Sequence, residues 1–284
     1  MAELGFIGLG NMGSVLAANL IAAGHTVVSH DVAGPERNPD GAEFVGTAAE
    51  VARRTEVIVL SLPDGGASQH VARDLAEVSE RRAGTVVDTS TVGVAAAYAI
   101  DAVLAAAGVA YVDAPVSGGV AGARTRTLSV MYAAPDAACR AAEPVLAGLS
   151  DRRRRVGDRT GMAQALKLAN NFLSATALAA TSEAIAFGLS VGLDMATMVE
   201  VIDGSSGQSA ATRDKFPNHV LTGRYGAGFA NSLMSKDLKL YLGAVEAQGS
   251  PSELGSVTAA VWERFAAAEP GVDFTRIYPF VERG

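Results

Sequence analysis

Cysteine is almost absent from this chain of 284 residues, and histidine is scarce. Cys139 is the only cysteine, so no disulfide can form within the chain and a reducing, cytoplasmic location is expected. The histidines show no H-x-x-x-H or related ligand spacing; they are His25, His30, His70 and His219. The sequence therefore predicts no metal site.

Positive charge is also in short supply. The chain has 23 Lys and Arg against 30 Asp and Glu, a net charge of −7. A protein that wraps nucleic acid needs a basic face to neutralise phosphates, so this balance argues against a nucleic-acid partner. The one basic cluster, residues 152–155, we interpret as a solvated turn and edge strand.

No long apolar run is free of polar residues. The segment from Phe172 to Val191 carries Glu183 and several Ser and Thr, so we expect a buried helix and no membrane span. Met1 leads directly into a predicted strand, and no signal peptide is expected. With 49% apolar and 19% charged residues the composition is globular, and the length suggests about two domains.

Glycine is present at a telling spacing near the start. Gly8, Gly10 and Gly13 follow the apolar run 4–7 and precede the helix-like run 14–20. Between a strand and a helix, G-x-G-x-x-G predicts a dinucleotide site: one glycine for the turn, one for approach of the pyrophosphate, one for helix–strand packing. The phosphates then face the helix N-terminus. The structural alternative is a plain glycine-rich turn.

A carboxylate follows the second predicted strand. Asp31 comes directly after Thr26–His30, where a ribose-binding residue is expected. Such a carboxylate repels a 2′-phosphate and favours NAD over NADP. Arg37 is the nearest cation, and a loop can bring it back, so NADP stays open. The structural alternative for Asp31 is a strand-end turn residue or helix cap.

The chain changes character near residue 160. Residues 1–160 alternate strands with helices, which predicts an α/β, Rossmann-type, doubly wound parallel sheet, and residues 161–284 are helical. One helix of roughly thirty residues, from Met162 to Val191, is expected to join the two domains. The expected strands are Glu3–Ile7, Thr26–His30, Val57–Leu60, Thr85–Asp88, Ala110–Asp113 and Leu128–Tyr132. The other expected helices are Gly66–Arg81, Val94–Ala106, Met195–Ile202, Ser232–Glu246 and Ser252–Ala268.

Two segments carry candidate chemistry. Lys167 and Asn171 stand at i and i+4 and share one face of the long helix. A lysine in so apolar a segment suits general acid–base work when its pKa is depressed; the alternative is a helix-surface lysine. Ser117, with Gly118 and Gly119, offers a hydroxyl and accessible amides that can hold a carboxylate, or else forms a tight turn.

Together these segments resemble the β-hydroxyacid dehydrogenase family, which includes 3-hydroxyisobutyrate dehydrogenase and tartronate, glyoxylate and succinic semialdehyde reductases. The motifs are GFIGLGNMGSVLAANL, DAPVSGGVAGARTRTL, GMAQALKLANN and KDLKL, in that order. The resemblance implies Lys167 as general acid–base, Asn171 as the residue that orients substrate, and Ser117, Gly118 and Gly119 as the carboxylate grip. It implies a cofactor site of Gly8, Gly10, Asn11, Met12, Gly13, Asp31, Leu62, Pro63 and Thr91, with Lys236 beside both the nicotinamide and the substrate.

The resemblance further implies a small carboxylate substrate, NAD or NADP as cofactor, and a homodimer or homotetramer. Two positions depart from the family pattern. Ala163 replaces the second glycine that usually precedes the lysine, and Arg126 replaces the glycine of the usual Gly-Thr-Leu that ends the substrate motif. The side chains of Arg124 and Arg126 either face solvent or add charge near the pocket. The alternatives are an imine reductase-like or a non-catalytic nucleotide-binding member. Lys167 argues against both, and the length argues against 6-phosphogluconate dehydrogenase.

Overall fold

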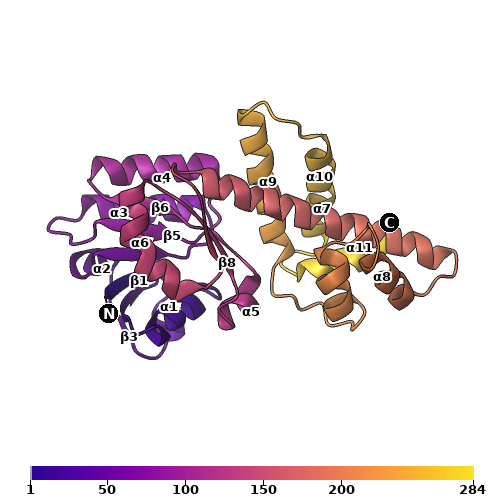
Figure 1. Cartoon of the computed structure of the whole chain (residues 1–284), viewed down its shortest axis with the longest axis horizontal. Helices are drawn as coiled ribbons and strands as arrows, with labels where there is room; N and C mark the ends of the chain where they lie inside the picture. The colour runs from indigo at the N-terminus through magenta and orange to yellow at the C-terminus, as the bar shows by residue number, and fades with distance from the viewer. Residues whose placement is uncertain (1) are drawn as a thin grey trace. The chain divides into compact units, whose positions relative to one another are not determined.

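The computed structural model describes residues 2–284 and divides into two compact units, Met1–Lys167 and Leu168–Gly284. The first unit is a sheet covered by helices, and the second is helical (Figure 1). The strands are β1 (Glu3–Ile7), β2 (Thr26–His30), β3 (Ala42–Phe44), β4 (Val57–Leu60), β5 (Thr85–Asp88), β6 (Ala110–Asp113), β7 (Val116–Ser117), β8 (Ser129–Ala133) and β9 (Arg153–Gly157). The helices of this unit are α1 (Gly13–Ala22), η1 (Pro35–Arg37), α2 (Ala48–Arg54), α3 (Gly65–Glu77), α4 (Val94–Ala106), α5 (Gly119–Arg124) and α6 (Asp136–Leu149).

The sheet has the strand order β3-β2-β1-β4-β5-β6-β8-β7, with β9 on β8. Strands β1 to β6 are parallel, and β1 lies between β2 and β4. The order reverses between β1 and β4, so the crevice outside their carboxyl ends is the place where an open α/β sheet binds a ligand. The Rossmann-type fold predicted from the sequence is confirmed.

Each face of the sheet has its own apolar core. One core joins the sheet to α1 and α6 through side chains such as Leu16, Leu20 and Leu146. The other joins it to α2, α3 and α4 through side chains such as Leu75 and Ile100. Because both faces are covered, the central strands are continuous apolar runs without polar alternation.

The far side of the sheet departs from the all-parallel prediction. The strand expected at Leu128–Tyr132 is β8, one residue later, and it runs antiparallel to β6. Strands β3 and β7 were not predicted because they have three and two residues, too few for a periodic pattern. At β9 the basic run is an edge strand, in which Arg153 and Arg155 pair with Glu143 and Asp136 of α6 at 2.8 and 2.7 Å.

The second unit is built on most of α7 (Met162–Ser190), which begins in the first unit. It continues through α8 (Met195–Asp203), η2 (Ala211–Val220), α9 (Asn231–Ala247), α10 (Glu253–Ala268), η3 (Phe274–Arg276) and α11 (Ile277–Glu282). Its core includes Leu178, Ile185 and Phe265, and the buried Trp262 indole N–H donates to the Ala175 carbonyl at 3.2 Å. The ten-residue π-helix η2 was not predicted.

Helix α7 is the one described helix long and apolar enough to cross a membrane by length and composition. In its most apolar window, 39% of the residues are buried within the protein. Its inner side carries Ala175, Leu178 and Ile185, which belong to the core of the second unit. Helix α7 thus contributes one side to the core of the second unit.

Candidate active site

The glycine-rich loop between β1 and α1 has the shape of a phosphate cradle. A Cβ on Gly8 would collide with the Ser61 carbonyl oxygen, and one on Gly13 would collide with the Gly8 carbonyl oxygen. These two glycines are therefore required by packing. Gly10 differs, since a Cβ there would meet no protein atom within 4 Å. The open space beside Gly10 fits a pyrophosphate at the N-terminus of α1.

Asp31, directly after β2, is attached to this loop. One carboxylate oxygen accepts from the Leu9 amide at 2.5 Å and the other from the Ala33 amide at 2.7 Å. The second bond closes a local turn, so the turn role weighed from the sequence is also present. A carboxylate has about four acceptor positions. Asp31 therefore retains capacity for ribose hydroxyls while being held beside the glycines.

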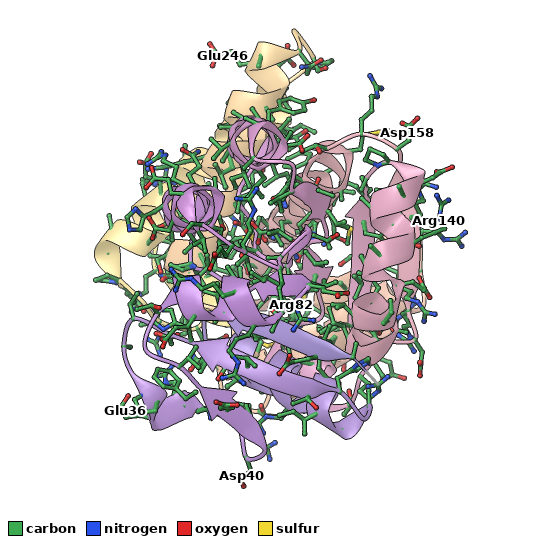
Figure 2. The ribbon with its side chains drawn as sticks, turned by 90° about the vertical axis from the view of Figure 1, so that its left-hand side faces the viewer. Glu36, Asp40, Arg82, Arg140, Asp158 and Glu246 are labelled. Atoms are coloured by element: carbon green, nitrogen blue, oxygen red, sulfur yellow. The ribbon has the colours of Figure 1, made fainter. Side chains whose placement is uncertain are left out.

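Arg37, at the end of η1, does return to the nucleotide loop. Its guanidinium donates to the Asn11 side-chain oxygen at 3.1 Å. Its acidic neighbours Glu36 and Asp40 extend outward from the same edge of the unit (Figure 2). A cation therefore lies at the glycine loop although it is six residues past Asp31 in the chain.

The loops after β4 and β5 meet at the same edge of the sheet. The Leu62 amide donates to the Ser90 hydroxyl at 2.8 Å, and the Leu62 side chain reaches the space beside Gly8. Pro63 follows Leu62, and Thr91 follows Ser90. The structure thus brings the loops of the predicted cofactor residues Leu62, Pro63 and Thr91 together at the carboxyl ends of adjacent strands.

Two buried carboxylates that sequence reasoning assigned no role lie behind these loops. Asp88 ends β5 and accepts from the Ser90 amide at 2.9 Å and the Tyr111 hydroxyl at 3.3 Å. Asp113 ends β6 and is equally buried. Burial raises the pKa of both groups, and it raises the pKa of Asp113 to about 6. The sequence did carry a signal for both residues, since each ends a predicted strand and precedes a loop of small residues.

Gln164, in the first turn of α7, was also missed. Its side chain is buried, and its oxygen accepts from the Val92 and Gly93 amides at 3.0 Å each. Its amide nitrogen donates to the Ser90 carbonyl at 3.0 Å and to Asp113 at 2.8 Å. A glutamine within a helix gives no sequence signal of this kind, because most are solvated.

The predicted substrate loop follows β6 and includes β7. Ser117 is half-buried and pairs with Ser129 of β8. Gly118 and Gly119 both have positive φ, at 129° and 65°, a conformation that side chains disfavour. Small residues at both positions leave the backbone amides of the turn accessible, as the predicted carboxylate grip requires.

The two departures from the family pattern have structural explanations. Ala163 is fully buried and packs with Met131 and Ala133 of β8, so its methyl group occupies an apolar gap. The Arg126 guanidinium donates to the carbonyls of Gly148 and Ala147 at 2.6 and 3.0 Å, at the C-terminal end of α6. The positive charge of Arg126 is therefore held at the C-terminal end of α6.

Lys167 and Asn171 are both buried, with only 7% and 6% of their surface exposed. The interpretation of Lys167 as a helix-surface residue is therefore wrong. In the second unit, the Asn171 amide donates to the Asp237 carboxylate at 2.6 Å, and the Lys236 ammonium lies 3.3 Å from the other oxygen of Asp237. Asp237 thus connects two predicted site residues.

Lys236, in α9, is only partly exposed. Its side chain is 28% exposed. It borders an open hollow of about 410 Å³, lined by Ser232, Ser235, Lys236, Lys239, Leu240 and Ala266. Residues 2–284 contain no cluster of three or more His, Cys, Asp or Glu arranged to hold a metal.

Two family models cover nearly the whole chain. Residues 3–157 match the NAD binding domain of 6-phosphogluconate dehydrogenase, and residues 161–281 match the NAD-binding domain of NADP-dependent 3-hydroxyisobutyrate dehydrogenase. The chain is 37% identical to 2-(hydroxymethyl)glutarate dehydrogenase of Eubacterium barkeri, over 92% of this chain and 88% of the relative. It is 34% identical to 3-hydroxyisobutyrate dehydrogenase of Pseudomonas aeruginosa, over 98% and 97%.

The chain belongs to the β-hydroxyacid dehydrogenase family. The solved structure of Mycobacterium tuberculosis 3-hydroxyisobutyrate dehydrogenase with L-serine has a TM-score of 0.91 and 31% identity, covering 99% of each chain. The imine reductase of a Pseudomonas species shares the fold, with a TM-score of 0.66 and 21% identity over 98% of each chain. As a member of this family, the chain is an NAD(P)-dependent oxidoreductase that acts on the CH–OH group of a small hydroxy acid.

Proposed function

We propose that this β-hydroxyacid dehydrogenase interconverts a small 3-hydroxy acid and its semialdehyde or oxo acid, with Lys167 as the general acid–base. The observation that carries the proposal is the burial of Lys167 in α7, one turn after residues bonded to the strand-end loops of the sheet. A buried lysine of this kind is suited to proton transfer, whereas a surface lysine mainly serves to keep the protein soluble.

The glycine-rich loop and Asp31 would hold the nicotinamide cofactor, which would supply the hydride acceptor for oxidation and the hydride donor for reduction. During oxidation, the Lys167 amine takes the proton of the substrate hydroxyl. In reduction, the Lys167 ammonium returns that proton to the carbonyl oxygen. Asn171, held by Asp237, orients the substrate at the reacting carbon. The Ser117 hydroxyl and the Gly118 and Gly119 amides hold the substrate carboxylate.

Replacement of Lys167 by Ala tests this assignment. The expected loss in kcat is about 100-fold to 10,000-fold, because a positioned acid–base group contributes that much. NADH affinity, measured by fluorescence titration, should change less than about twofold, since the nucleotide loop is untouched. Lys215→Met is the matched control, as Lys215 is a partly buried lysine of the second unit paired with Asp214. Near-normal turnover by Lys167→Ala would refute the role.

Substrate identity is tested with a panel. It contains 3-hydroxyisobutyrate, 2-(hydroxymethyl)glutarate, serine, threonine, glycerate and 4-hydroxybutyrate, together with their oxidised forms. Activity on a 3-hydroxy acid supports the proposal. Reduction of a cyclic imine without activity on any hydroxy acid supports the imine reductase alternative, and cofactor binding without turnover supports the non-catalytic one.

We also infer that NAD is preferred over NADP, because the fixed carboxylate of Asp31 repels a 2′-phosphate. The positive charge of Arg37 at the glycine loop acts in the opposite direction, because it attracts a 2′-phosphate. The kcat/KM with NADP should rise about tenfold in Asp31→Asn and fall by a similar factor in Arg37→Ala. The kcat/KM of Arg37→Ala with NAD should stay within about twofold of that of the unaltered enzyme. Equal or better turnover of the unaltered enzyme with NADP would overturn the preference.

A homodimer, or a tetramer built from such dimers, is the proposed assembly. The outer face of α7 carries exposed Leu173, Ala180 and Phe187 at seven-residue spacing. Leu173 and Phe187 are 65% and 71% exposed, which is unusual for such large apolar side chains. A heptad stripe is complementary to the same stripe on a second copy. We also infer a reducing, cytoplasmic location, which the single free cysteine supports.

A further inference from the structure

The first turn of α7 is held by a buried polar network. Gln164 uses both lone pairs of its side-chain oxygen and both hydrogens of its side-chain nitrogen, so its hydrogen-bonding capacity is complete. Its partners lie in two different places: residues 90–93 after β5, and Asp113 at the end of β6. One side chain thus joins a helix to two strand-end loops.

Asp113 completes the network from the sheet side. One of its oxygens accepts from the Gly161 and Gln164 backbone amides at 3.0 and 3.1 Å, and the other accepts from the Gln164 side chain at 2.8 Å. Those amides belong to the start of a helix, where backbone N–H groups have no partner within the helix. A carboxylate supplied by a neighbouring strand therefore caps α7.

The network is placed between the three parts that the reaction requires. Thr91, predicted to line the cofactor, is flanked by Ser90 and Val92, and both of these bond to Gln164. Ser117, predicted to hold the substrate carboxylate, follows Asp113 by four residues. Lys167 follows Gln164 by three residues, about one helical turn.

We propose that Gln164 and Asp113 are positioning residues that keep Lys167 in register with the cofactor loop and the substrate loop. Neither residue has to contact substrate for this, because each acts through the backbone that it holds. The inference rests on the proposed role of Lys167. Its physical reason is that a misplacement of about 1 Å at a reacting centre costs about 100-fold in rate.

The first test is Gln164→Met, which keeps the length of the side chain and removes its four hydrogen bonds. The expected result is a fall in kcat of about 100-fold, with KM for substrate and NAD within about fivefold. A deuterium label on the carbon that bears the hydroxyl should also give a larger isotope effect on kcat than in the unaltered enzyme. A merely destabilised enzyme would lose folded protein without changing the isotope effect.

The second test exchanges donor and acceptor. Gln164→Glu sets two carboxylates against each other, and Asp113→Asn removes the charge that caps α7. In the double variant, the side-chain amide introduced at position 113 can donate to the carboxylate introduced at position 164, which still accepts from the Val92 and Gly93 amides. The double variant should recover at least about tenfold in kcat over Gln164→Glu alone, since only the bond to the Ser90 carbonyl is lost.

Thr55→Val is the control for stability, since it removes a buried hydroxyl that follows α2 and donates to the Val51 carbonyl of that helix. It should lower Tm and leave the isotope effect unchanged. The inference is overturned if Gln164→Met, corrected for its folded fraction, retains kcat within about threefold, or if the double variant shows no recovery. Lys167→Ala is assayed in parallel. Retained activity in Lys167→Ala refutes the proposed function, whereas loss there with retained activity in Gln164→Met refutes only the positioning role.

Discussion

Arg126 has two opposing effects on the free energy of unfolding. Its φ is 56°, in the left-handed region that favours glycine. Its guanidinium meanwhile satisfies two carbonyls at the end of α6, where the helix leaves such groups without partners. The arginine therefore stabilises α6 and strains its own backbone.

These two effects can be separated by two substitutions. Arg126→Ala should lower the free energy of unfolding by about 1–2 kcal/mol, because both hydrogen bonds are lost and the strain is kept. Arg126→Gly should be more stable than Arg126→Ala by about 1 kcal/mol, because the strain is also removed. Urea denaturation of the three proteins measures both differences. A glycine variant less stable than the alanine variant would contradict this account.

At the same scale, the site residues differ in how visible they are in the sequence. Gly8, Gly10 and Gly13 are recognisable because a strand, a tight turn and a helix have to follow one another closely in the chain. Gln164 and Asp237 act across long sequence separations, on Asp113 and Asn171. Nothing in their local spacing predicts those partners, so only the tertiary structure identifies them.

At the scale of the elements, the first turn of α7 is capped by a titratable group. Burial, supported by the nearby Asp88 carboxylate and opposed by the hydrogen bonds from Gln164 and Gly161, raises the pKa of the capping Asp113 to about 6. The folded state therefore binds a proton between about pH 4 and 6 that the unfolded state has released. The contribution of Asp113 to stability falls as the pH rises through this range and is constant above it.

Asp113→Asn tests the sign of this dependence. The free energy of unfolding of the variant relative to the unaltered protein should rise by up to about 3 kcal/mol from pH 4 to pH 7, because two pKa units of the carboxyl are removed. Asp88 and Tyr111 are the titratable groups facing Asp113. Chemical denaturation at several pH values measures the difference. A difference that is flat or falls with pH would contradict the assignment.

The predictability of each strand followed its length and apolar character, whereas the 14-residue helix α6 was not among the predicted helices. Five of the six predicted strands have the predicted bounds, since each is an apolar run of four or five residues between turn residues. The two-residue β7 depends on its pairing with β8, and β8 runs antiparallel to both β6 and β7; a local pattern does not encode these pairings. The π-helix η2 contains Pro217 and polar residues, so its pattern matched neither a helix nor a strand.

At the scale of the whole molecule, the exposed stripe on α7 predicts the assembly state. Phe187→Asp or Leu173→Asp should convert the proposed dimer or tetramer to a monomer of 28.9 kDa, because a charge in an apolar interface is costly to bury. Light scattering coupled to gel filtration measures the mass. Val257→Asp on α10 is the matched control, since Val257 is 66% exposed and outside the stripe. An unchanged mass in both α7 variants would exclude this face as the interface.

The sequence by itself determined the fold class, the dinucleotide loop and the family, because each of these depends on residues close together in the chain. Strand–turn–helix order, apolar periodicity and the four ordered motifs are local properties. The tertiary structure decided which side chains act together. It returned Arg37 to the glycine loop, buried Lys167, and joined Gln164 to Asp113. These contacts join residues 26 to 51 positions apart, and burial depends on everything packed around a residue, so no local pattern can specify them.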